Sequence, residues 1–125
     1  MEQTKKRILI IDDDEKHLFT TRELLENEGY EVFIHSLGFG ATNIIINLQP
    51  DLILLDVNMP GLSGEKLSSL LKANRYTKDT PVVFYSSNDE SSLRQAVATS
   101  GIEGYICKGD IFNLRNQVAF YLSPL

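Results

Sequence analysis

Acidic, hydroxyl and basic side chains follow four short apolar runs of this sequence, at the point where each run ends. The groups are Asp12-Asp13-Asp14, Asp56, Ser86-Ser87 and Lys108. Carboxylates that lie close together repel one another, and a divalent cation such as Mg²⁺ or Mn²⁺ removes that conflict. A bound cation would also neutralise a phosphoryl group and leave one carboxylate as nucleophile. The residue types therefore indicate aspartyl-phosphate chemistry, with Ser86 and Lys108 available to bind phosphoryl oxygens.

Each of these residues also has a simpler interpretation when it is taken alone. Asp14 could cap a helix, and a single Asp56 or Ser86 at a strand end is often a turn former. Lys108 alone would be a solvated lysine. Their occurrence together, each at the end of an apolar run, favours one shared site over four unrelated explanations.

The apolar runs and the segments between them predict the elements that would bring these side chains together. Runs of strand length occupy 8–11, 32–34, 52–55, 82–85 and 105–107, and segments of helical spacing occupy 15–28, 38–48, 64–74, 89–100 and 111–122. Three runs are continuously apolar, which is typical of strands covered on both faces. Segment 38–48 is the weakest helix, because Gly38 and Gly40 lower its propensity. The alternation predicts an α/β fold with a doubly wound parallel sheet, in which ligands bind at the carboxyl ends of the strands.

Length and composition limit the class of protein. The 125 residues predict one domain, residues 1–125, without an output domain, either free-standing or cut from a longer protein. A net charge of −5, from 12 basic and 17 acidic residues, argues against a nucleic-acid binder. No run approaches the ~20 apolar residues of a membrane span, and the start lacks a signal peptide. The single cysteine, Cys107, excludes an internal disulfide, so we expect a cytoplasmic protein and a packing role for Cys107.

Four motifs in this order and spacing closely resemble the receiver domains of two-component response regulators, including the chemotaxis regulators. They are ILIIDDD (8–14), PDLILLDVNMPGLSG (50–64), PVVFYSS (81–87) and GYICKGD (104–110). The resemblance covers nearly the whole chain. It implies a flavodoxin-like (βα)5 fold with the strand order 2-1-3-4-5, an order that is inherited from the family.

The resemblance also implies a role for each matching residue. Asp56 would be the phosphoacceptor, served by a sensor histidine kinase or a histidine phosphotransfer protein. The ligands of Mg²⁺ or Mn²⁺ would be Asp12, Asp13, Asp56 and the backbone carbonyl of Asn58.

Three further roles follow from the same resemblance. Ser86 and Lys108 would bind the phosphoryl oxygens, and Ser86 and Tyr105 would act as the switch. Asn58 and Asn88 border the attacking water in this family, so they would tune the lifetime of the phosphoaspartate. Phosphorylation would change a partner-binding face, and a phosphorylation-dependent dimer is compatible with the resemblance.

Two features of the sequence bear on these expectations. The family usually has proline after the lysine, where this chain has Gly109. A cis bond without proline costs ~2.5–4 kcal/mol, so the sequence leaves open whether the 108–109 bond is cis or trans. His17 and His35 have no partner at metal-ligand spacing, which favours surface positions or local hydrogen bonds.

Two other functions compete with the phosphorylation-controlled binding module, which is itself not an enzyme. One is an aspartyl-phosphate phosphatase of the haloacid dehalogenase type. Those enzymes carry a second aspartate two residues after the nucleophile, where this chain has Asn58. The other is a receiver-like scaffold that works without phosphate, which the complete set of site residues disfavours.

Overall fold

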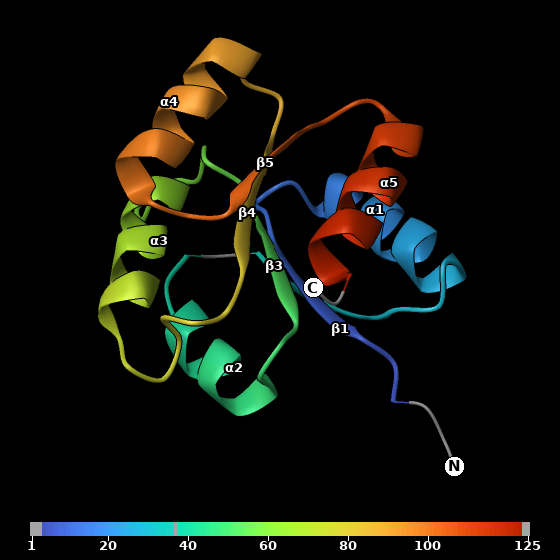
Figure 1. Ribbon diagram of the computed structural model, residues 1–125, viewed down its shortest axis with the longest axis horizontal. Helices are drawn as coiled ribbons and strands as arrows, with labels where there is room; N and C mark the ends of the chain where they lie inside the picture. The colour runs from blue at the N-terminus through green and yellow to red at the C-terminus, as the bar shows by residue number, and fades with distance from the viewer. Residues whose placement is uncertain (1–3, 37, 124–125) are drawn as a thin grey trace.

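A computed structural model describes residues 4–36 and 38–123 of the chain. Over these residues five strands alternate with five helices (Figure 1): β1 (Arg7–Ile11), α1 (Glu15–Asn27), β2 (Glu31–His35), α2 (Ala41–Leu48), β3 (Leu52–Leu55), α3 (Gly64–Ala73), β4 (Val82–Ser86), α4 (Glu90–Ser100), β5 (Gly104–Cys107) and α5 (Ile111–Leu122). The strands form one parallel sheet in the order β2-β1-β3-β4-β5. The predicted flavodoxin-like fold is therefore confirmed.

Helices cover both faces of the sheet, as the continuous apolar runs predict. Figure 1 shows α2, α3 and α4 on one side of the strands and α1 and α5 on the other. Because successive strand residues point to opposite faces, Leu9 and Ile11 pack with the first group of helices while Ile8 and Ile10 pack with the second. All four of these side chains are fully buried. The central strands are thus held rigidly from both sides.

Side-chain caps set the start of most helices. Asp14 accepts a hydrogen bond from the backbone N–H of His17, so the simpler interpretation of Asp14 as an N-cap is correct. Ser63, Asp89 and Asp110 cap α3, α4 and α5 in the same way. Each capped helix follows a loop that begins with polar residues at the end of a strand, so the caps also shape these loops.

Helix α2 differs from its prediction. It begins at Ala41 and not at residue 38, because Gly40 takes a left-handed conformation with φ of 82° and offers no side-chain cap. A left-handed residue cannot continue a right-handed helix. The prediction that this helix is the weakest of the five is consistent with its eight residues, which make it the shortest helix in the described part of the chain.

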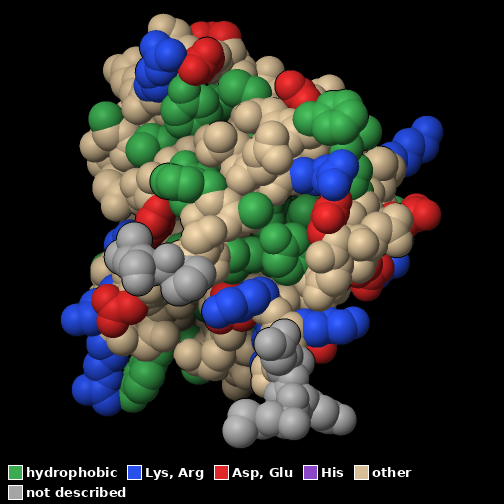
Figure 2. Space-filling model, turned by 45° about the vertical axis from the view of Figure 1, so that its right-hand side comes forward, with side chains coloured by type: hydrophobic (Ala, Val, Ile, Leu, Met, Phe, Trp, Pro, Cys, Tyr) green, Lys and Arg blue, Asp and Glu red, His purple; other side chains and the backbone are tan. Residues whose placement is uncertain are grey.

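The surface carries charges of both signs. On the face shown in Figure 2, basic and acidic side chains are interleaved with apolar ones. Within residues 4–36 and 38–123, none of the helices combines the length and the apolar character that a membrane span requires.

Candidate functional site

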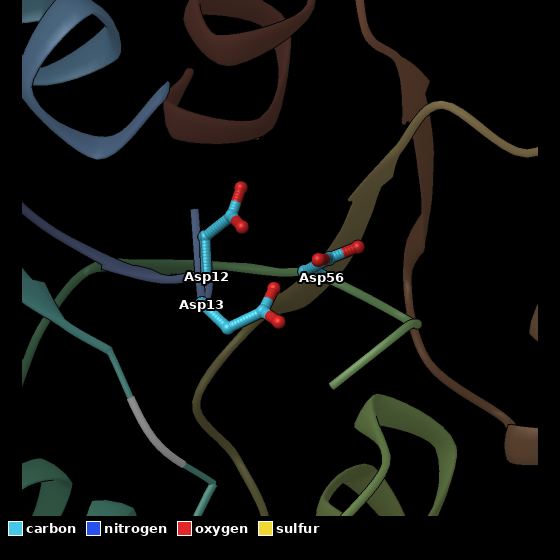
Figure 3. A group of neighbouring side chains, drawn as sticks. All are labelled: Asp12, Asp13 and Asp56. Atoms are coloured by element: carbon cyan, nitrogen blue, oxygen red, sulfur yellow. The ribbon is translucent and has the colours of Figure 1, made fainter. Parts of the chain in front are cut away.

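Asp12 and Asp56 lie side by side because the strands that precede them are paired. Ile11 pairs with Leu55 at the ends of β1 and β3, and the backbone N–H of Asp56 donates to the Ile11 carbonyl at 2.9 Å. Asp13 completes a cluster in which one carboxylate oxygen from each residue lies within 4.8 Å of the others (Figure 3). We call Asp12, Asp13 and Asp56 the carboxylate pocket. The predicted convergence of these three side chains is observed.

The carboxylate pocket is electrostatically costly in the absence of a cation. Asp12 and Asp56 are only 1% and 6% exposed, whereas Asp13 is open to solvent. Burial raises the pKa of Asp56 from 3.8 to about 6; the Lys108 ammonium opposes that rise and the Asp12 carboxylate adds to it. Carboxylate oxygens from three residues meet in one partly shielded pocket, and such oxygens are the ligands that a hard divalent cation prefers. A bound cation would also offset the cost of ionising the buried Asp56. The residues therefore fit Mg²⁺ or Mn²⁺.

Lys108 reaches into the carboxylate pocket from the end of β5. Its Nζ donates to Oδ2 of Asp12 at 2.6 Å and lies 4.0 Å from Oδ2 of Asp56. Its backbone N–H donates to the Ser86 carbonyl at 2.9 Å. No peptide bond among the described residues is cis, so the bond between Lys108 and Gly109 is trans. The lysine reaches the site without a cis bond.

A chain of hydrogen bonds leads from Asp56 through Asn58 and Asn88 to Ser86. The buried Ser86 hydroxyl accepts a hydrogen bond from the Asn88 N–H at 3.2 Å. The Asn58 amide donates to Oδ1 of Asn88 at 2.6 Å, while the Asn58 backbone N–H points to Oδ1 of Asp56 at 3.3 Å. A hydrogen bond therefore joins the two residues predicted to tune phosphoaspartate lifetime, one after β3 and one after β4.

Tyr105 points away from the carboxylates and toward α4. Its hydroxyl donates to Oε1 of Glu90 at 2.6 Å and accepts from Nε of Arg94 at 3.3 Å. Glu90 and Arg94 also pair with each other at 2.9 Å. The Tyr105 hydrogen bond, with the Arg94 charge next, lowers the pKa of Glu90 below 4.5. We call these three residues the Tyr105 surface; they line a hollow of about 660 Å³ between α4 and α5.

Two residues beside the site were not assigned to it from the sequence. Nδ1 of His17 lies 3.7 Å from Oδ2 of Asp12, and burial followed by the Lys108 charge lowers the His17 pKa below 6.5. The ring of Tyr85 lies beneath the Lys108 ammonium, 5.6 Å from the ring centroid to Nζ. The N-cap at Asp14 indicates that His17 lies in the first turn of α1, close to the end of β1. No comparable signal in the sequence places Tyr85 beside the site.

The remaining predictions about single residues have mixed outcomes. His35 makes the expected local hydrogen bond, from Nε2 to the Phe39 carbonyl at 3.0 Å. His17 also has a local contact, with the Thr21 hydroxyl, but it is half-buried beside the site. Cys107 is only partly buried and packs against the core. A packing role for Cys107 is consistent with that position.

Comparisons with known proteins decide the family. The model of the response regulator receiver domain matches residues 8–119. This chain belongs to that family. The polar-differentiation response regulator DivK of Brucella ovis is 33% identical over 107 residues, which cover 82% of this chain and 84% of DivK.

Solved structures agree with the receiver fold. The chemotaxis protein CheY4 of Vibrio cholerae superposes with a TM-score of 0.87 at 22% identity, covering 95% of this chain and 100% of that chain. The receiver domain of the sensor histidine kinase PA1611 of Pseudomonas aeruginosa, with a magnesium ion coordinated in its active site cleft, superposes with a TM-score of 0.85 at 20% identity, covering 95% and 98%. The receiver therefore has the fold that its sequence predicts.

Proposed function

We propose that this receiver accepts a phosphoryl group on Asp56 from a phosphohistidine donor and that the transfer changes a partner-binding face. The observation that carries the proposal is the convergence of Asp12, Asp13 and Lys108 on Asp56 at the edge of the sheet. The donor would be a sensor histidine kinase or a histidine phosphotransfer protein. Membership of the receiver family supports a kinase partner in general, and the identity of the donor stays a prediction.

Mg²⁺ or Mn²⁺ would be held by Asp12, Asp13, Asp56 and the backbone carbonyl of Asn58. When bound, the cation supplies charge neutralisation for the carboxylates and the phosphoryl oxygens. The magnesium ion of the Pseudomonas receiver accompanies the same fold, whereas the fit in this chain is argued from its own three carboxylates. The metal requirement is therefore a direct test of the pocket.

The chain's own residues would carry the transfer. A carboxylate oxygen of Asp56 forms a bond to phosphorus while the bond from phosphorus to the donor imidazole nitrogen breaks, and that nitrogen keeps the electron pair. Lys108 would bind one phosphoryl oxygen as a point charge, and the Ser86 hydroxyl would donate to another. The amide of Asn58, which is bonded to Asn88, cannot act as the general acid of a phosphatase. The absence of a second carboxylate at this position therefore favours a signalling phosphoacceptor over a phosphatase that turns over small phosphoesters.

The response would pass through Ser86 and Tyr105. If the Ser86 hydroxyl moves toward the phosphoryl group, it would free space beside β4. The Tyr105 ring would then break its contacts with Glu90 and Arg94 and rotate inward. The face made by α4, β5 and α5 would present a different shape to an output partner. A phosphorylation-dependent dimer stays a prediction.

The test is intact-mass measurement after incubation with acetyl phosphate, with and without Mg²⁺. We expect a single phosphoryl adduct on the wild-type protein that requires Mg²⁺ and is absent from Asp56→Asn. Asp79→Asn is the matched control, because Asp79 is an exposed aspartate outside the carboxylate pocket. It should accept the adduct like the wild type.

Two results would count against the proposal. An adduct that persists in Asp56→Asn would exclude Asp56 as the acceptor. Absence of any adduct on the wild type, together with failure of beryllofluoride to bind in the presence of Mg²⁺, would favour the phosphate-independent scaffold. The beryllofluoride arm separates rapid hydrolysis from a site that does not bind phosphate.

A further inference from the structure

Lys108 needs an external restraint to reach the carboxylate pocket reproducibly. Lysine carries its charge on a flexible four-carbon stem and loses considerable rotamer entropy when it is held in one place. The residue after it, Gly109, has φ of 106° and open space around the position of a Cβ, so it offers no packing against the lysine. The hydrogen bond from the Lys108 backbone N–H to the Ser86 carbonyl fixes the position of the lysine backbone but not the direction of its side chain.

The ring of Tyr85 supplies a restraint on the side of Lys108 away from solvent. Its centroid lies 5.6 Å from Nζ, within the range of a cation–π contact. Tyr85 is 5% exposed and the Lys108 side chain is 13% exposed. Such a contact is stronger when water is excluded, as it is here.

Tyr85 is itself held in place by α1. The His17 ring lies 5.4 Å from the Tyr85 ring at an angle of 51°, and Tyr85 belongs to the same buried cluster as Leu18 of α1. Burial raises the pKa of Tyr85 above 10.0, so the ring stays neutral and presents its electron-rich face to the ammonium. Helix α1 thus fixes an aromatic surface beneath Lys108.

The Asp12 carboxylate cannot restrain Lys108 throughout the proposed reaction. The Lys108 ammonium donates a hydrogen bond to Oδ2 of Asp12 at 2.6 Å, and Asp12 is one of the residues that would hold the cation. A cation on Asp12 competes with the ammonium for that carboxylate and repels it. A ring face, in contrast, attracts the ammonium without requiring its N–H donors, which remain free for a phosphoryl oxygen.

We propose that Tyr85 is a positioning residue: its ring keeps the Lys108 ammonium over the carboxylate pocket while Lys108 exchanges the Asp12 carboxylate for a phosphoryl oxygen on Asp56. The inference rests on the proposed function, since the exchange has meaning only if Asp56 accepts a phosphoryl group. The contact between the ring and the ammonium exists independently of that transfer, so it can be tested first.

The first measurement is NMR of the Lys108 side chain in the protein without metal or phosphodonor, with the signals assigned by their loss in Lys108→Met. We expect the protons next to Nζ to be displaced upfield by the ring in the wild type and in Tyr85→Phe. They should return to ordinary lysine positions in Tyr85→Leu, or in Tyr85→Met if the leucine variant does not fold. An ordinary position in the wild type, or an unchanged upfield position without the ring, overturns the inference.

The second measurement is the rate of phosphorylation by acetyl phosphate with Mg²⁺. We expect Tyr85→Leu to lower the rate constant by about three- to tenfold and Tyr85→Phe to stay within about twofold of the wild type. In the Lys108→Met background, Tyr85→Leu should have no further effect. An equal reduction with and without Lys108 would show that Tyr85 acts through packing alone and would overturn the positioning role.

Failure of the proposed function gives a different pattern. If the wild type takes no adduct on Asp56, the phosphoacceptor role fails and the exchange fails with it, whatever the NMR shows. If the wild type is phosphorylated on Asp56 and Tyr85→Leu matches its rate, only the role of Tyr85 is refuted. The failure of the phosphoacceptor role and the failure of the Tyr85 role are therefore distinguishable.

Discussion

The carboxylate pocket and the Tyr105 surface both contain charged side chains, but the two regions differ in how deeply those side chains are buried. In the pocket, Asp12 and Asp56 follow buried central strands and are almost completely shielded from solvent. At the Tyr105 surface, the side chains of Glu90 and Arg94 are 55% and 67% exposed, and β5 is an edge strand. We therefore expect the side chains of Asp12 and Asp56 to move little and those of the Tyr105 surface to move more.

Under the proposed function, this difference would separate the chemistry in the carboxylate pocket from the response at the Tyr105 surface. Charges in a shielded pocket interact strongly, and their positions are set by strand pairing that would cost much to disturb. Exposed ion pairs contribute little to stability because solvent screens them, so we expect the Tyr105 surface to rearrange at small cost. A molecule that must react in one place and change shape in another gains from this division, because a modest event in the pocket can then shift the population of the surface.

The largest expected effect tests the rigidity around the pocket. Gly64, the first residue of α3, is buried, and a Cβ there would overlap the Asp56 carbonyl oxygen. We expect Gly64→Ala to reduce the free energy of unfolding by about 3 kcal/mol, as overpacking against backbone does. Urea unfolding followed by circular dichroism measures the loss.

A second glycine provides the control for that experiment. Gly101 has φ of 69° with open space around its Cβ position, so Gly101→Ala should cost only about 1 kcal/mol for the left-handed conformation. If Gly64→Ala costs no more than Gly101→Ala, the loop after Asp56 is free to adjust. That outcome would contradict the view that the pocket is more rigid than the Tyr105 surface.

An intermediate effect is expected from the pH dependence of stability. The pKa of Asp56 is raised from 3.8 to about 6 in the folded protein, so the folded state holds this proton more tightly than the unfolded chain does. The contribution of Asp56 to stability is therefore most favourable below about pH 4 and is lost as the pH rises to about 6. Asp56→Asn does not ionise and avoids this loss. At pH 7 it should be more stable than the wild type by on the order of 2 kcal/mol.

Urea unfolding from pH 4 to pH 8 without divalent cations measures that difference. The gap between Asp56→Asn and the wild type should close as the pH falls from about 6 to about 4. Addition of Mg²⁺ at pH 7 should narrow it, since a ligand stabilises the folded protein that binds it better. Asp79→Asn should show neither effect. A wild type more stable than Asp56→Asn at pH 7 without metal would show that burial of the charge is not the dominant cost.

The sheet could be predicted closely because its signal is local. The runs 8–11, 52–55 and 82–85 are continuously apolar, and β1, β3 and β4 match them within one residue at each end. The start of α2 could not be predicted as well, because it depends on the left-handed conformation of Gly40. Composition alone does not reveal which of two nearby glycines adopts it.

The site divides in a similar way. Strand order and the polar strand ends together predict the convergence of Asp12, Asp56 and Lys108, because topology alone brings those positions to one edge. The contact between Lys108 and Tyr85 depends on the direction of a lysine side chain and on the packing of α1, neither of which has a sequence period. The sequence therefore predicts the fold around this site, and the structure adds the directions of the side chains.

The smallest expected effect on stability tests the softness of the Tyr105 surface. Glu90→Gln removes the negative charge of the carboxylate that accepts a hydrogen bond from the Tyr105 hydroxyl and forms an ion pair with Arg94. Because these groups are exposed, we expect no measurable change in the free energy of unfolding. The ring signals of Tyr105, observed by NMR of fluorotyrosine-labelled protein, should shift and broaden as the ring samples more orientations.

The matched control is Glu26→Gln, which removes an exposed partner four residues from Arg22 on α1 and leaves Tyr105 untouched. Because the Glu90 pKa is lowered, its contacts should persist above pH 4.5 and weaken as the pH falls below it, so the wild-type spectrum should approach that of Glu90→Gln in acid. If Glu90→Gln instead destabilised the protein as much as Gly64→Ala does, the Tyr105 surface would be as rigid as the pocket. A phosphoryl group on Asp56 would then have to overcome a large barrier to move Tyr105, and the division between a fixed site and a mobile face would not hold.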